Sequence, residues 1–218
     1  YVLETQGEIN PADILNGKTT RIKRLPSGRI PPRSRILVNY DYVRNFQQDI
    51  TEGFTFSDPL TYQLYESAIL RPRLAQVNPD YVFIGMDEIR GFNRDSRSKK
   101  RGLMNHQLFA SFLNNITHLI HSYAPSAKIL IWDDMLSPYH NGGDENYQLR
   151  YGGQPGRTCD ALYQIDKSSI IPISWWYSST DPNGKMENST RLYGDLGFQF
   201  FVAPWDNVEN IQRWSEIA

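Results

Sequence analysis

The feature that most constrains the fold is an alternation of short apolar runs with amphipathic stretches from residue 36 onward. Five apolar runs have the length and composition of buried strands: 36–40, 81–86, 129–132, 170–175 and 198–203. The clearest amphipathic stretch places its apolar residues on one face of a helix: Leu108, Phe109, Phe112, Leu113, Ile116, Leu119 and Ile120. Because parallel sheets are covered by crossover helices on both faces, this order predicts an α/β protein with a parallel sheet.

Two further helices are predicted, one near residues 60–77 and one after the fifth apolar run. Pro72 is expected to kink or split the first of them. Asp206 or Asn207 is expected to cap the second, whose apolar face comprises Val208, Ile211, Trp214 and Ile217. Pro172 weakens the prediction of a strand at 170–175, because proline cannot donate a hydrogen bond to a sheet.

Two architectures accommodate these elements: a (β/α)8 barrel of the TIM type, or an open five-stranded doubly wound sheet. Both place functional residues at the carboxyl ends of the strands. A complete barrel usually needs about 250 residues, whereas this chain has 218. With about five β/α units, a barrel would be incomplete in this chain. Residues 1–35 are polar and contain the hairpin signal Asn16-Gly17, so they predict a small β-rich extension before an α/β domain at 36–218.

Composition argues against several classes of protein. The chain has 23 Lys and Arg against 24 Asp and Glu, which does not favour nucleic acid or an anionic membrane as a partner. A single cysteine, Cys159, excludes an internal disulfide. No apolar run approaches the roughly 20 residues that span a bilayer, and no signal peptide opens the chain, so a soluble protein is expected. The four histidines have no metal-ligand spacing and no glycine-rich phosphate loop follows a strand, so neither a metal nor another cofactor is expected.

Acids and aromatic rings follow each of the five apolar runs. In chain order these ends are Tyr40-Asp41-Tyr42, Asp87-Glu88, Trp132-Asp133-Asp134, Trp175-Trp176-Tyr177 and Pro204-Trp205-Asp206. Aromatic faces stack on the C–H surfaces of sugars, and carboxylates accept hydroxyl hydrogen bonds or move protons. The alternative is that the rings pack in the core and the acids cap helices, which fits Asp206 best. Capping does not account for the clustered tryptophans, so we predict a carbohydrate ligand.

Asp87 and Glu88 are the strongest candidates for catalysis. Two adjacent acids at the end of an apolar run are costly to bury unless chemistry uses them, and a desolvated carboxyl suits a general acid near neutral pH. The alternative is a structural ion pair with Arg90 or Arg94. Either arginine is also a candidate to bind the carboxylate of an acidic sugar. The basic residues between Arg90 and Arg101 otherwise predict a solvated loop and the start of a helix.

The segment Phe83-Ile84-Gly85-Met86-Asp87-Glu88 resembles the His-x-Gly-Gly-Asp-Glu signature of family 20 glycoside hydrolases, the β-N-acetylhexosaminidases. Trp132-Asp133-Asp134-Met135-Leu136 is similar to a segment of the hexosaminidase D branch. The resemblance covers roughly residues 58–140 and, loosely, 169–206. It implies a (β/α)8 barrel with the Asp-Glu pair at the end of the fourth strand. Phe83 and Met86 replace the signature's His and second Gly, and the bulkier Met86 is expected to narrow the sugar pocket.

The resemblance implies hydrolysis of N-acetylhexosaminides. Glu88 would protonate the leaving glycosidic oxygen, and Asp87 would hold the 2-acetamido group, whose carbonyl oxygen attacks the anomeric carbon in place of a protein nucleophile. Trp132, Trp175 and Trp205 would wall the pocket, and Tyr177 would donate a hydrogen bond to the acetamido oxygen. The whole set of expected substrate-binding residues is Asp41, Arg90, Trp132, Asp133, Asp134, Trp175, Trp176, Tyr177, Trp205 and Asp206.

Two other functions stay open at this point. One is a glycosidase of another barrel family that uses two protein carboxylates, with Glu88 paired to Asp134 or Asp206. The other is a carbohydrate-binding relative that kept the fold and lost catalysis, which the replacements at Phe83 and Met86 favour. The particular sugar and linkage, the oligomeric state and the compartment are not indicated by the sequence.

Overall fold

The structure, a computed structural model, describes residues 2–4, 21–23, 55–178, 180–181 and 183–217. Contacts divide the chain into two units, Tyr1–Thr51 and Glu52–Ala218. In the first unit, β1 (Val2–Glu4) pairs antiparallel with β2 (Arg21–Lys23). The Asn16-Gly17 turn, the expected boundary at residue 35 and the predicted strand at 36–40 lie outside the described residues.

The second unit contains a four-stranded parallel sheet in the order β3-β4-β5-β6. Its strands are β3 (Tyr81–Phe83), β4 (Lys128–Trp132), β5 (Ile170–Trp175) and β6 (Phe201–Ala203). The prediction of an α/β protein with a parallel sheet is confirmed. β4 and β5 occupy their predicted ranges, whereas β3 and β6 are shorter than the apolar runs that predicted them.

Pro172 lies inside β5 without breaking it. The carbonyl of Ile173 accepts a hydrogen bond from the N–H of Asp133, so Ile173 faces β4 and the neighbouring Pro172 faces the side of β6. Pairing with β6 begins only at Ile173, opposite Phe201. The missing N–H of Pro172 therefore falls before that ladder, where no partner strand needs it.

The helices largely follow the predicted pattern, with two differences. Those of the second unit are α2 (Pro59–Leu64), η1 (Tyr65–Leu74), α3 (Ala75–Val77), α4 (Ser96–Arg101), α5 (Asn105–His121), α6 (Lys185–Leu196) and α7 (Val208–Ile217). Short 3-10 turns are η2 (Asn141–Gly143), η3 (Leu149–Tyr151) and η4 (Cys159–Tyr163). The helix predicted near 60–77 is a run of α-helical and π-helical turns with Pro72 in its π-helical part. α6 was not predicted, because its buried face mixes Met186 and Tyr193 with Ser189 and Thr190.

The predicted apolar stripe of the last helix is wrong in part. In α7 the buried residues are Asn210 and Trp214, whereas Val208 and Ile211 are exposed. The side chain of Asn207, rather than that of Asp206, caps this helix by accepting a hydrogen bond from the N–H of Asn210 at 3.2 Å.

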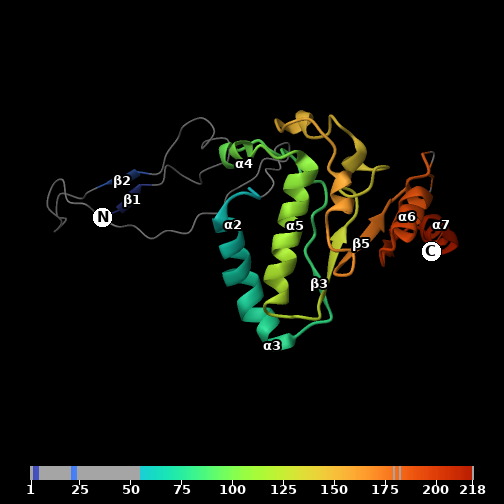
Figure 1. Cartoon of the computed structure of the whole chain (residues 1–218), viewed down its shortest axis with the longest axis horizontal. Coiled ribbons are helices and arrows are strands. Elements are labelled where there is room, and N and C mark those ends of the chain that lie inside the picture. Colours follow the sequence, from blue (N-terminus) through green and yellow to red (C-terminus); the bar gives the residue numbers. More distant parts are fainter. Residues whose placement is uncertain (1, 5–20, 24–54, 179, 182, 218) are drawn as a thin grey trace. The chain divides into compact units, whose positions relative to one another are not determined.

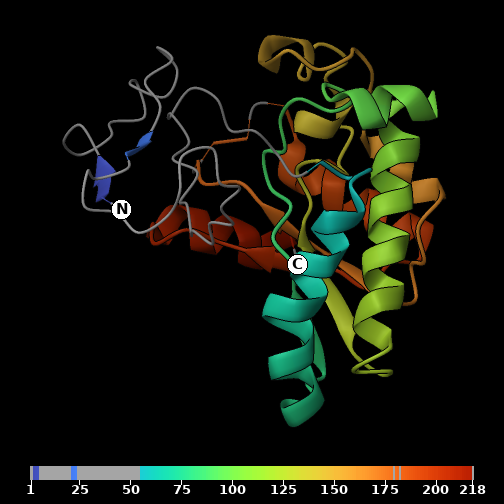
Figure 2. The same cartoon turned by 90° about the vertical axis from the view of Figure 1, so that its left-hand side faces the viewer.

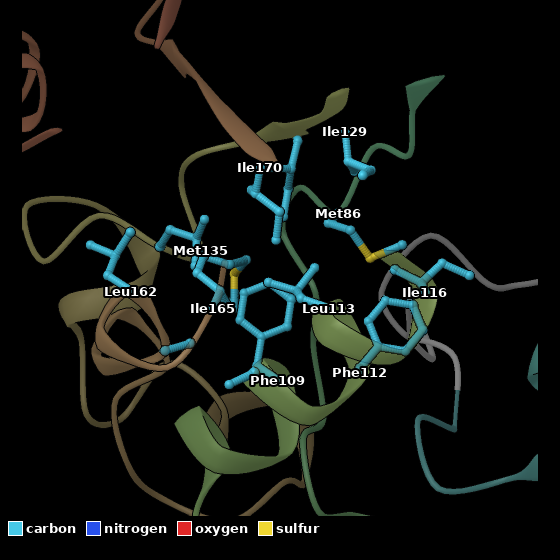
Figure 3. Close-up of a cluster of buried hydrophobic side chains, with 14 of the residues drawn as sticks. Met86, Phe109, Phe112, Leu113, Ile116, Ile129, Met135, Leu162, Ile165 and Ile170 are labelled. Atoms are coloured by element: carbon cyan, nitrogen blue, oxygen red, sulfur yellow. The ribbon is translucent and has the colours of Figure 1, made fainter. Parts of the chain in front are cut away.

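On one face of the sheet, η1, α5 and α6 contribute buried apolar side chains to a core that also includes residues of β4 and β5. Figures 1 and 2 show α2 and α5 side by side along that face. Figure 3 shows apolar side chains of α5, among them Phe109, Leu113 and Ile116, against Ile129 of β4 and Ile170 of β5. Full burial of such side chains stabilises the fold by about 1.5–3 kcal/mol each.

The opposite face of the sheet is open and concave in the described part of the chain. Tyr81 and Phe83 of β3 are 48% and 50% exposed. Tyr81 and Phe201 belong to the two edge strands, yet their ring centroids are 6.1 Å apart. In a flat sheet, three strand spacings would separate β3 from β6 by about 14 Å, so the sheet curves toward this face. The expectation that helices cover both faces is therefore not met by the described residues.

Candidate active site at the carboxyl ends of the strands

The acidic loop (residues 85–88) follows β3 in an unusual backbone conformation. Gly85, Met86 and Glu88 have φ angles of 74°, 75° and 44°, a region that residues with a side chain rarely adopt. The carbonyl of Gly85 still accepts a hydrogen bond from the N–H of Trp132 at 2.9 Å. Beyond it the chain turns outward, and the side chains of Asp87 and Glu88 are both exposed. The expected burial of this acidic pair is therefore wrong.

Met86 turns its side chain into the protein. It is 6% exposed and points toward Leu113 and Ile116 of α5 in the core (Figure 3). The expectation that Met86 narrows a sugar pocket is therefore wrong. Its packing against α5 anchors the loop that presents the two acids.

Glu88 has partners on both its backbone and its side chain. Its N–H donates to Oδ2 of Asp134 at 2.9 Å, and its Oε2 lies 3.1 Å from Nη2 of Arg90. The guanidinium of Arg90 also stacks on the ring of Tyr151, with 4.5 Å between Cζ and the ring centroid. The ion-pair alternative for Arg90 is therefore present in the structure. Arg90 faces Glu88 and Tyr151, with 19% of its side chain exposed.

Asp133 and Asp134 after β4 are both buried, and they face different parts of the molecule. Asp133 accepts a hydrogen bond from the hydroxyl of Tyr193 on α6 at 3.1 Å. Asp134 accepts from the Glu88 N–H and from Nδ2 of Asn141 at 2.8 Å, so it lies beneath the acidic loop. Neither carboxyl reaches the surface, where a sugar would bind.

Burial dominates the protonation of these two carboxyls. Burial raises the pKa of Asp133 to about 7, although hydrogen bonds from Ser174 and Tyr193 act in the opposite direction. Burial raises the pKa of Asp134 to about 6, although hydrogen bonds from the Glu88 amide and from Asn141 act in the opposite direction. The raised pKa values therefore belong to two buried carboxyls at the end of β4, beside the strand that leads to Glu88.

Three aromatic rings form a row beside the acidic loop. The aromatic row consists of Trp175, Tyr177 and Trp205, with ring centroids 4.8 Å apart for the first pair and 4.5 Å for the second. Burial and the charges of Asp87, Asp134 and Glu88 raise the pKa of Tyr177, so these acids lie within electrostatic range of the row. Tyr177 is 41% and Trp205 53% exposed. The row therefore offers flat apolar surface beside exposed carboxylates.

The remaining predicted residues lie around this centre. Trp132 contacts Phe83 edge to face at 5.3 Å, on the open face of the sheet. Trp176 carries the ammonium of Lys185 over its ring at 4.0 Å and donates from Nε1 to the carbonyl of Thr180. Asp206 is exposed. Asp41 lies outside the described residues.

Asn210 of α7 supports the aromatic row, although no sequence pattern predicts it as a functional residue. Its Nδ2 donates to the carbonyls of Trp176 and Ser178, and its Oδ1 accepts from the N–H of Trp205 at 2.8 Å. This buried amide ties the end of β5 to the end of β6. No motif marks Asn210, because its partners are distant in the sequence.

His140, Asn141 and Gln148 were missed for the same reason. The ring of His140 lies 4.7 Å from that of Trp175, and burial lowers the pKa of His140 to about 4, so the ring is neutral at pH 7. Gln148 accepts from the N–H of Phe92 and donates to the carbonyl of Ile89, which fixes the segment after the acids. These residues position the site without forming a recognisable sequence pattern.

No known family model matches the chain, and a search of curated proteins gives no match. Among the described side chains, no three His, Cys, Asp or Glu residues are grouped as metal ligands would be. None of the helices described in the structure combines the length and the apolar composition needed to cross a membrane.

Proposed function

We propose that this chain is a glycoside hydrolase of the family 20 type, acting on an N-acetylated hexosaminide. The observation that carries the proposal is the exposed pair Asp87 and Glu88 beside the aromatic row, at the carboxyl ends of parallel strands. Rings that stack on a sugar and acids that exchange protons with it are the two components such a reaction needs.

The scaffold in this proposal is part of a (β/α)8 barrel. The four described strands are adjacent in chain order, and the sheet curves so that its edge residues Tyr81 and Phe201 meet. A doubly wound sheet reverses its strand order at a switch point and is covered on both faces. The described sheet has neither feature, which favours the barrel over the open sheet.

The backbone at Met86 supports the resemblance to the family 20 signature. That signature has glycine where this chain has Met86, and Met86 adopts φ 75°, a conformation in which glycine is the usual residue. The loop at Met86 therefore has a backbone conformation that the glycine of the signature would adopt without strain. Both acids stay exposed because the Met86 side chain points into the core.

In the proposed reaction, Glu88 transfers its proton to the glycosidic oxygen as the bond between that oxygen and the anomeric carbon breaks. The acetamido carbonyl oxygen of the substrate, held by Asp87, forms the new bond to the anomeric carbon. Glu88 then takes a proton from the water that opens this cyclic intermediate, which restores the acid. Oε2 of Glu88 lies 3.1 Å from Nη2 of Arg90, so the proposed reaction includes separation of this ion pair as the substrate binds.

The test is the substitution Glu88→Gln, which keeps the size of the side chain and removes its proton chemistry. We expect kcat on an aryl N-acetylglucosaminide to fall by about 10³-fold, within the range of a lost general acid. Glu209→Gln is the control, because Glu209 is an exposed acid on α7, outside the site. Unchanged turnover in a folded Glu88→Gln protein, checked by circular dichroism, contradicts the assignment.

A carbohydrate-binding protein without catalysis is the second candidate. It is favoured by the Glu88–Arg90 ion pair, which occupies the carboxylate that would act as the acid. Calorimetry with N-acetylglucosamine distinguishes the two: binding without hydrolysis of a glycoside panel supports this candidate. The pairing of Glu88 with Asp134 as a nucleophile is not favoured, because the Asp134 carboxyl is 0% exposed.

A further inference from the structure

Asp134 occupies the central position between the two halves of the candidate site. It follows β4, which lies between β3 and β5 in the sheet. A side chain at this place can reach the loop after β3 on one side and the end of β5 on the other. Asp134 is fully buried there, so its contacts are with protein groups and not with a ligand.

On the side of β3, Asp134 holds the acidic loop through its backbone. Its Oδ2 accepts hydrogen bonds from the Glu88 N–H at 2.9 Å and from Nδ2 of Asn141 at 2.8 Å. Glu88 has φ 44°, a conformation that persists only where surrounding structure holds it. The hydrogen bond to a carboxylate supplies that restraint directly at the strained residue.

On the side of β5, Asp134 faces the indole of Trp175. Oδ1 of Asp134 and Nε1 of Trp175 are both buried and each lacks a hydrogen-bond partner within the described structure. The indole is nevertheless close enough to lower the pKa of Asp134. A buried acceptor and a buried donor that face each other in this way form a hydrogen bond after a small adjustment of either side chain.

We propose that Asp134 is a positioning residue that couples the acidic loop carrying Glu88 to the aromatic row that begins at Trp175. The carboxylate restrains Glu88 through its amide and orients Trp175 through its indole N–H, so the acid and the sugar-stacking surface keep a fixed separation. The consequence for catalysis rests on the proposed glycosidase function. The coupling itself is a structural property and is measurable without any substrate.

The protonation of Asp134 controls this coupling, because a protonated carboxyl loses one acceptor position to its own hydrogen. Burial raises the pKa of Asp134 to about 6, so the coupling weakens as pH falls through that value. Asp134 interacts electrostatically with five titratable groups: Asp87, Asp133, Tyr147, Tyr177 and Tyr193. It also binds the backbone amide of a sixth, Glu88. The three tyrosines are neutral near pH 6, because the ordinary pKa of tyrosine is about 10 and burial raises it further in each.

The experiment is an NMR titration of the ¹⁵N-labelled full chain from pH 5 to pH 8. We expect the backbone amide of Glu88 and the indole N–H of Trp175 to shift together with one midpoint near 6. In Asp134→Asn this common titration is lost. Asp133→Asn is the matched control: it changes an adjacent buried acid that faces α6, and the common titration is expected to remain. Titration of Glu88 and Trp175 with unrelated midpoints in the unsubstituted chain overturns the proposal, even if Asp134→Asn does not fold.

Kinetics then separate positioning from the proposed function. If the unsubstituted chain hydrolyses an aryl N-acetylglucosaminide, Asp134→Asn is expected to lower kcat by about 100-fold, as a displaced catalytic group does, with a smaller change in KM. Equal losses in kcat and stability for Asp134→Asn and Asp133→Asn contradict positioning and indicate a general packing role. If the unsubstituted chain shows no hydrolysis, the proposed function fails, while the NMR result still decides the coupling.

Discussion

Met86 combines two properties that are seldom found in one residue: a positive φ and a buried apolar side chain. The left-handed backbone costs roughly 1–2 kcal/mol for a residue with a Cβ. Burial of the side chain against Leu113 and Ile116 stabilises the fold by about 1.5–3 kcal/mol. Packing against α5 therefore offsets the strain, and it fixes the direction in which the chain leaves the core toward Asp87 and Glu88.

This balance predicts an unusual order of stability for substitutions at residue 86. Met86→Ala and Met86→Gly both lose the buried side chain, at a cost of about 2–5 kcal/mol. Only Met86→Gly also relieves the positive φ, so we expect it to be at least as stable as Met86→Ala in urea unfolding. Leu113 is the control, because it is buried in the middle of α5, where the backbone is helical. There Leu113→Gly is expected to be less stable than Leu113→Ala by about 1 kcal/mol. If the Gly variant is less stable than the Ala variant at both positions, the backbone at Met86 is not strained.

At the scale of elements, α7 supports the site through Asn210 more than through an apolar stripe. Asn210 is buried, and it joins the backbones of Trp176, Ser178 and Trp205. Asn210→Ala leaves the Ser178 carbonyl and the Trp205 N–H without their partner, whereas the Trp176 carbonyl keeps its hydrogen bond from Nε1 of Trp214 at 3.3 Å. The expected cost is roughly 2 kcal/mol in total. We expect a lower free energy of unfolding and weaker binding of N-acetylglucosamine, measured by urea denaturation and calorimetry.

The control for this prediction is Ile211→Ala on the same helix, where the side chain is 46% exposed. Ile211→Ala is expected to change stability by less than about 0.5 kcal/mol, as surface substitutions usually do. If Asn210→Ala destabilises the protein without affecting sugar binding, then α7 contributes to the fold and not to the arrangement of the aromatic row.

The elements differ in how well the sequence predicts them. β4, β5 and α5 follow directly from apolar runs and helical periodicity, because their burial is continuous and apolar. α6 escapes prediction because it buries hydroxyl groups, with the Ser189 hydroxyl 2.7 Å from that of Ser137. The acids and rings after the strands were predicted from their positions at the strand ends. The roles of Asn141, Gln148 and Asn210 depend on long-range contacts that periodicity does not contain.

At the scale of the whole molecule, stability depends on pH through three buried groups of the described chain that titrate between about pH 4 and 7: Asp133, Asp134 and His140. Between about pH 4.5 and 5.5 the folded state holds protons on Asp133 and Asp134 that the unfolded state has released, because burial raises both pKa values. In the same range the unfolded state holds a proton on His140 that the folded state lacks, because burial lowers the pKa of His140 to about 4. The folded state therefore binds a net excess of about one proton.

Excess protons in the folded state mean that stability falls as pH rises. One net proton corresponds to a loss of about 1.4 kcal/mol in unfolding free energy per pH unit. We expect the midpoint of urea unfolding to decrease between pH 4.5 and 6.5, and to decrease further up to pH 7 as Asp133 ionises. Asp133→Asn removes one of the two acid contributions, which act in the same direction and oppose that of His140, so the remaining acid and His140 nearly cancel. Unfolding free energy in this variant is therefore expected to be almost independent of pH from 4.5 to 6.5. A steep fall that persists in Asp133→Asn would mean that carboxyls other than Asp133 carry the buried protons.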